Sequence, residues 1–93
     1  MLIALDFDGT YTESPELWDL FIAAAKKRGH DVICCTMRHE TTEGEDVKKA
    51  LIGKVSRIVF TSRKNKIDAL RAIGLSPKIW IDDSPGWIFR DAL

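Results

Sequence analysis

The chain alternates short, continuous apolar runs with longer segments in which apolar residues recur every three or four positions. Short runs of aliphatic and β-branched residues without polar alternation are typical of strands in a parallel sheet that is covered on both faces. The pattern therefore predicts strands at residues 2–5, 31–36, 55–61 and 78–81.

The amphipathic segments between these runs predict helices. The first begins at Ser14-Pro15 and ends near Arg28, because a hydroxyl cap, a proline at the first helical position and a following glycine are typical helix boundaries. Its expected buried face consists of Leu17, Leu20, Phe21, Ala24 and Ala25. The second helix is expected over residues 42–52, with Val47, Ala50 and Leu51 facing inward, and the third over residues 64–73, with Ile67, Leu70 and Ile73 facing inward. A last helical turn is expected after residues 84–85.

Strands and helices that alternate in this way predict parallel strands joined by right-handed crossovers. The expected fold class is α/β, a three-layer α/β/α arrangement around a small, parallel, Rossmann-like sheet of about four strands in the order 4-1-2-3. Residues 1–93 are expected to form a single domain. Because one helix and one strand fill the segment between Thr36 and Lys64, no cap domain is expected.

In the strand order 4-1-2-3 the fourth strand lies at an edge of the sheet. We expect residues 87–89 to cover that edge, or the edge to pair with another chain.

Acidic residues end two of the predicted strands. Asp6 and Asp8 follow the first strand, and Asp82 and Asp83 follow the fourth. The carboxyl ends of parallel strands lie at one edge of a sheet, so these carboxylates are expected to converge. In an extended chain the side chains of Asp6 and Asp8 share a face, and like charges raise each other's pKa unless a cation lies between them. Oxygen ligands of this kind suit Mg²⁺, which usually serves a phosphate group.

Together these segments resemble the haloacid dehalogenase superfamily of phosphohydrolases. The similarity rests on DFDGT at residues 6–10, a strand ending in Thr36, a lysine before a helix, and a strand ending in the acids 82–83, and it extends from residue 2 to about residue 88. It implies a phosphatase that hydrolyses phosphomonoesters with Mg²⁺ as cofactor. Asp6 would be the nucleophile that forms an aspartyl-phosphate, and Asp8 the general acid and then the general base. By the same resemblance Thr36 would bind phosphoryl oxygens, and Asp82 and Asp83 would complete the Mg²⁺ site with Asp6 and the backbone carbonyl of Asp8.

The lysine of this set has two candidates. We favour Lys66 over Lys64 because it is closer to the apolar face of the third predicted helix, and either ammonium would oppose the charge on the phosphoryl oxygens. To assist the leaving group Asp8 must be protonated, and the neighbouring carboxylate is expected to raise its pKa. The residues expected to contact the substrate are Gly9, Thr10, Met37, Arg38 and Lys64.

Composition narrows the classes of partner. Lysine plus arginine and aspartate plus glutamate number 14 each, so no charge excess favours nucleic acid or an anionic membrane. Acids occur by residue 6, and no apolar stretch reaches the roughly 18 residues of a membrane span, so neither a signal peptide nor a membrane anchor is expected. The adjacent Cys34 and Cys35 are interpreted as reduced core residues of a cytoplasmic protein.

The expected partner is a phosphorylated substrate, and an uncapped site also admits a macromolecular one. A homo-oligomer formed through the fourth-strand edge is a further expectation. The alternative function is that of a catalytically silent relative that binds phosphate or a partner. A signalling receiver domain is disfavoured because the third predicted strand, Val59-Phe60-Thr61, offers no aspartate for phosphorylation.

Overall fold

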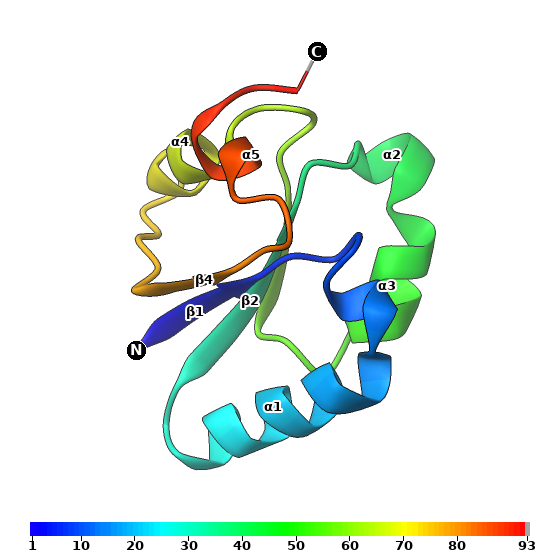
Figure 1. Ribbon diagram of the computed structural model, residues 1–93, viewed down its shortest axis with the longest axis vertical. Coiled ribbons are helices and arrows are strands. Elements are labelled where there is room, and N and C mark those ends of the chain that lie inside the picture. The colour runs from blue at the N-terminus through cyan, green and yellow to red at the C-terminus, as the bar shows by residue number, and fades with distance from the viewer. Residues whose placement is uncertain (93) are drawn as a thin grey trace.

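The computed structural model describes residues 1–92 and forms an α/β domain with helices on both faces of a parallel sheet (Figure 1). In this part of the chain the strands are β1 (Leu2–Leu5), β2 (Asp31–Thr36), β3 (Arg57–Phe60) and β4 (Ile79–Ile81). They pair in the order β3-β2-β1-β4, and all three pairings are parallel. The predicted fold class and strand order are confirmed, and no cap domain is inserted within residues 1–92.

Alternating side chains of the strands contribute to two separate apolar cores. On one face Ile3 and Leu5 pack with residues of α1 (Pro15–Lys27) and α3 (Glu45–Leu51). On the other face Ala4 packs with Leu70 of α4 (Lys66–Arg71). This is the period of two that a strand covered on both sides requires. The remaining short helices are the 3₁₀ turn η1 (Tyr11–Glu13), α2 (Glu40–Glu43) and α5 (Gly86–Phe89).

Helix α1 buries a face that overlaps the predicted one only in part, because Phe21 and Ala25 face the core as predicted and Leu17, Leu20 and Ala24 do not. Leu17 and Leu20 are 55% and 72% exposed, whereas Ile22 and Ala25 are buried and Trp18 packs against the same core. Positions 18, 21, 22 and 25 also follow the helical spacing, so the sequence supports two overlapping apolar faces. The indole Nε1 of Trp18 donates a hydrogen bond to the carbonyl of Thr10, which fixes the rotation of the helix.

The other element boundaries differ from the predictions for local reasons. The expected helix over residues 42–52 is divided into α2 and α3 at Gly44, which lies against the ring of Phe60. Helix α4 starts at Lys66 instead of residue 64, because Ser62 and Arg63 adopt left-handed conformations with φ of 53° and 71°. The Asn65 side chain then caps the helix by accepting a hydrogen bond from the amide of Asp68. Ile73 follows the end of α4 and is exposed.

Strand β4 is an edge strand, as predicted. Helix α5 packs mainly against α4, and Phe89 is 67% exposed. These contacts give no support to the expectation that residues 87–89 cover the β4 edge. Cys34 and Cys35 are buried free thiols, as the sequence predicted, and burial raises the pKa of the Cys35 thiol to about 12. None of the helices in residues 1–92 is both long and apolar enough to span a bilayer.

Candidate active site

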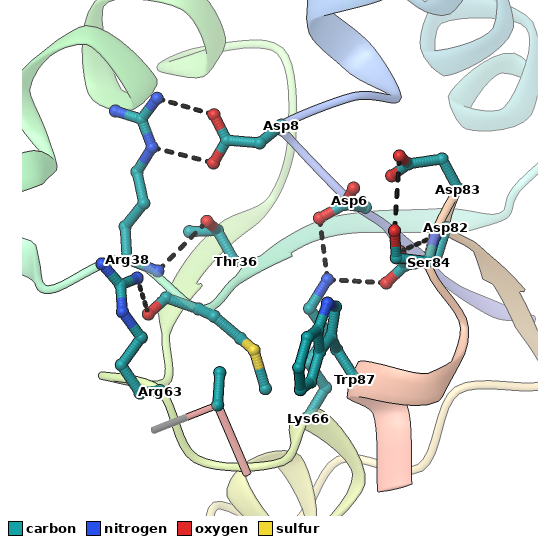
Figure 2. Close-up of a pocket in the computed structure, with 12 residues that line it drawn as sticks. Asp6, Asp8, Thr36, Arg38, Arg63, Lys66, Asp82, Asp83, Ser84 and Trp87 are labelled. Atoms are coloured by element: carbon teal, nitrogen blue, oxygen red, sulfur yellow. Dashed lines mark hydrogen bonds and ion pairs between the residues drawn. The ribbon is translucent and has the colours of Figure 1, made fainter. Parts of the chain in front are cut away.

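Three carboxylates meet at the carboxyl ends of the two neighbouring strands β1 and β4. Asp6 follows β1, and its amide donates a 2.9 Å hydrogen bond to the carbonyl of Ile81, the last residue of β4. Asp82 and Asp83 come next along the chain, and one oxygen from each of Asp6, Asp82 and Asp83 lies within 4.8 Å of the others. The predicted convergence is therefore present for Asp6, Asp82 and Asp83, whereas Asp8 is not part of this group (Figure 2).

Lys66 joins two of these acids through a buried ammonium group. Its Nζ donates to Asp6 Oδ1 at 2.7 Å and to Asp82 Oδ2 at 2.6 Å, and the residue is only 3% exposed. Burial alone would lower the pKa of Lys66, but the hydrogen bonds and charges of the two carboxylates outweigh it and raise the pKa. Lys66 is therefore a fixed positive charge at the bottom of the site.

The cluster retains more negative charge than Lys66 balances. The pKa of Asp6 is raised to about 6, because burial and the nearby charge of Asp82 together outweigh the bond to Lys66, which acts in the opposite direction. Three carboxylates facing one ammonium thus favour an additional cation. Carboxylate oxygens at this spacing, some of them buried, are the hard ligands that fit Mg²⁺.

Thr10 and Gly9 position Asp83. The Thr10 hydroxyl lies 3.0 Å from Asp6 Oδ2 and 3.2 Å from Asp83 Oδ1, and it accepts a hydrogen bond from the amide of Asp83 at 3.1 Å. Gly9 has a φ of +80°, and a Cβ at this position would collide with the Asp83 carboxylate. The two residues were expected to contact the substrate, but they lie against the acid cluster and neither lines the cavity.

Asp8 points away from Asp6 and is held by Arg38. The guanidinium binds both carboxylate oxygens, from Nε at 2.9 Å and from Nη2 at 2.7 Å (Figure 2). The hydrogen bond to Arg38 lowers the pKa of Asp8, so the expected upward shift from the neighbouring carboxylate was wrong. The reason is local backbone geometry. The chain turns after β1, with the amide of Thr10 bonded to the carbonyl of Phe7, so Asp6 and Asp8 do not lie on one face of an extended strand.

Arg38 is itself fixed by the segment that follows β2. Its Nη1 donates to Asp46 Oδ1 at 2.6 Å and to the carbonyl of Glu43 at 2.8 Å. The guanidinium also lies over the Phe7 ring, 5.1 Å from the centroid. The arginine thus bridges the loops after β1 and β2, and its charge is shared between two carboxylates.

These residues surround an open cavity of about 340 Å³. It is lined by Asp6, Asp8, Thr36, Met37, Arg38, Arg63, Lys66, Asp82, Asp83, Ser84, Trp87 and Ala92. Thr36 ends β2, is buried, and accepts a 3.4 Å hydrogen bond at its hydroxyl from the amide of Arg38. Lys64, the alternative lysine, is exposed and lies beside a separate hollow with Asn65 and Asp68, so the structure brings Lys66 into the site and leaves Lys64 outside.

Sequence reasoning missed four of the lining residues, namely Arg63, Ser84, Trp87 and Ala92. Arg63 lies at the cavity because its left-handed backbone is held against Met37. Its amide and its side-chain Nη1 each donate a 2.9 Å hydrogen bond to the Met37 carbonyl. No simple periodicity signals such a turn. Ser84 directly follows the acid pair and was the easiest of the four to find.

A scan of protein-family models and searches of curated proteins and of solved structures found no match to this chain.

Proposed function

We propose that this chain is a Mg²⁺-dependent phosphatase that hydrolyses phosphomonoesters through an aspartyl-phosphate on Asp6. The observation that carries the proposal is the meeting of Asp6, Asp82 and Asp83 around one point, with the buried ammonium of Lys66 joining two of them. Three acids and one lysine at the carboxyl edge of a parallel sheet, beside an open cavity, form a site for an anionic group and a cation together.

The carboxylates of Asp6, Asp82 and Asp83 would hold the ion. When bound, Mg²⁺ supplies charge neutralisation that lets a carboxylate approach a phosphoryl group and keeps the two in line. Within the chain, Thr10 and Gly9 contribute by keeping Asp83 close to Asp6.

Asp6 supplies the nucleophile. One carboxylate oxygen forms a bond to phosphorus while the bond from phosphorus to the leaving oxygen breaks, and the phosphoryl group remains on Asp6 until water displaces it. Lys66 and the hydroxyl of Thr36 would oppose the charge that spreads over the equatorial phosphoryl oxygens. Both side chains are buried at the cavity wall, so they are held in place before the substrate arrives.

Asp8 would transfer the protons to the leaving oxygen and from the attacking water. Its carboxylate lines the cavity, and when it is bound to Arg38 it suits the second step, in which a base takes a proton from the attacking water. In the first step the leaving oxygen needs a proton, and Asp8 can carry one only when its bonds to Arg38 are loosened. Arg38, expected to contact the substrate, therefore also controls the charge of Asp8.

The test is release of phosphate from an aryl phosphate with Mg²⁺ and with a chelator. We expect Mg²⁺-dependent turnover in the wild type, and at least about a thousandfold loss in Asp6→Asn, as for removal of a catalytic nucleophile. Asp31→Asn is the matched control, since Asp31 begins β2 at the opposite end of the strand and is exposed. Mass spectrometry of acid-quenched wild-type protein should find phosphate on the peptide that contains Asp6.

Full turnover by Asp6→Asn would refute the assignment of the nucleophile. A wild type that binds phosphate and Mg²⁺ without turnover would instead support the catalytically silent alternative.

A further inference from the structure

One wall of the candidate active site is apolar, although the group handled at its centre would be an anion. Met37, Trp87 and Ala92 line the same cavity as the acids and Lys66. Figure 2 shows the Trp87 ring on the Lys66 side of this cavity, across from Arg38 and Arg63. A phosphoryl group is bound by charges and hydrogen-bond donors, which the side chains of Met37 and Ala92 do not offer, so this wall would face the group to which the phosphate is attached.

Trp87 is partly exposed, yet its backbone is fixed. The residue is 41% exposed and belongs to α5. Its neighbour Ile88 is buried, with 5% exposure, and anchors the turn, while the Trp87 amide donates to the carbonyl of Ser84 at 3.1 Å. The guanidinium of Arg90 lies over the indole, 5.6 Å from its centroid. Arg90 thus contacts the ring without lining the cavity, whereas Trp87 itself lines it.

Phe89 provides a contrast within the same turn. It is 67% exposed and does not line the cavity. Two aromatic residues two positions apart are both exposed, but only Trp87 borders the acids. Exposure alone therefore does not distinguish the two rings. Their positions do, because only Trp87 could contact a ring that is bound in the cavity.

We propose that Trp87 and Met37 form a binding wall for a planar ring, so that the site prefers phosphomonoesters whose leaving group carries such a ring. This inference rests on the proposed function and adds the chemical class of the substrate. A flat ring stacks on an indole, and the thioether of Met37 adapts to rings of different size. The ring can belong to a nucleoside or to a phenolic group, since both offer the same π face.

The test compares kcat/KM for a 5′-nucleoside monophosphate, an aryl phosphate and the ring-free glycerol phosphate. Loss of one aromatic stacking contact costs about fivefold or more in affinity. We expect Trp87→Ala to lower kcat/KM by that factor for the ring-bearing esters and to leave glycerol phosphate within about twofold. Trp87→Phe should restore most of the loss, and the matched control Phe89→Ala should change none of the three values. The ester that shows the larger loss of kcat/KM in Trp87→Ala, either the nucleotide or the aryl phosphate, identifies which kind of ring the site prefers.

A second measurement does not depend on turnover. In the Asp6→Asn background, titration with a nucleoside monophosphate should quench indole emission, and replacement of Trp87 by Phe should remove the quenching. An equal loss for all three substrates in Trp87→Ala, or quenching that survives Trp87→Phe, would overturn the inference while leaving the phosphatase proposal intact. If the wild type hydrolyses no phosphomonoester, the phosphatase proposal fails, and quenching that depends on Trp87 still supports the ring-binding wall.

Discussion

Replacement of Lys66 by methionine tests the charge balance on which the site depends. The ammonium lies 2.7 Å from Asp6 and 2.6 Å from Asp82, and its side chain is 4% exposed. Methionine keeps most of the volume but removes the charge, so two buried carboxylates would face each other without compensation. Removal of one partner from a buried ion pair typically costs about 3–5 kcal/mol. Domains of this size unfold with roughly 5–14 kcal/mol, so the variant should fold with much reduced stability.

The loss should depend on pH in a defined direction. The pKa of Lys66 is raised, so titration of Lys66 itself removes its contribution only above about pH 10, and any change at lower pH comes from the carboxylates. The pKa of Asp6 is already about 6 in the presence of Lys66, and removing the ammonium would raise it further. At pH 5 Asp6 is then neutral in the variant, and the cost of the missing charge shrinks. The difference in unfolding free energy between wild type and variant should therefore be larger at pH 8 than at pH 5.

The assay is urea denaturation followed by circular dichroism, without Mg²⁺, at both pH values. Lys64→Met is the matched control, because Lys64 is exposed and its change should stay within about 0.5 kcal/mol. Equal effects of the two substitutions at pH 8, or the same loss at pH 5 and pH 8, would refute the reasoning about the buried pair.

Two further predictions concern the cation. Gly9→Ala should weaken Mg²⁺ binding measured by calorimetry, because the new Cβ would displace the Asp83 carboxylate. The matched control is Gly53→Ala. Gly53 has the same φ of +80°, so the backbone strain should be similar, but the space around it is open and Mg²⁺ binding should not change. Equal Mg²⁺ affinity in the two variants would contradict the proposed position of Asp83. Mg²⁺ affinity should also fall about tenfold between pH 7.5 and pH 5, since a group with a pKa of about 6 binds the ion only when ionised. An affinity that does not change over this range would exclude Asp6 as a ligand.

The fold and the centre of the site followed from the sequence, because both depend on short-range patterns. The apolar runs marked the strands, their alternation with amphipathic segments gave the parallel order, and the shared edge of such a sheet brought Asp6 and Asp82 together. Lys66 was favoured over Lys64 from helical periodicity alone, and the structure buries Lys66.

What the sequence did not reveal depends on tertiary geometry. The turn after β1 separates the Asp8 side chain from Asp6. Asp8 instead forms an ion pair with Arg38, which is 30 positions away in the sequence. The left-handed pair Ser62 and Arg63 has no glycine to mark it. Residues 87–89 were expected at the β4 edge, whereas Trp87 lines the cavity, because the direction of its side chain depends on how α5 packs against α4.

The two helical layers are unequal in thickness, and this affects how the domain would lose activity. Among the described residues, the core on the α1 and α3 side includes eleven buried residues, whereas the core on the α4 side includes four. Lys66 and Trp87 belong to α4 and α5, the thinner side. Regions with little buried apolar surface open at lower free energy than the rest of a protein. On warming, the α4 layer should detach while the sheet and α1 persist, so the proposed activity would be lost before global melting, and amide exchange should be faster in α4 than in α1.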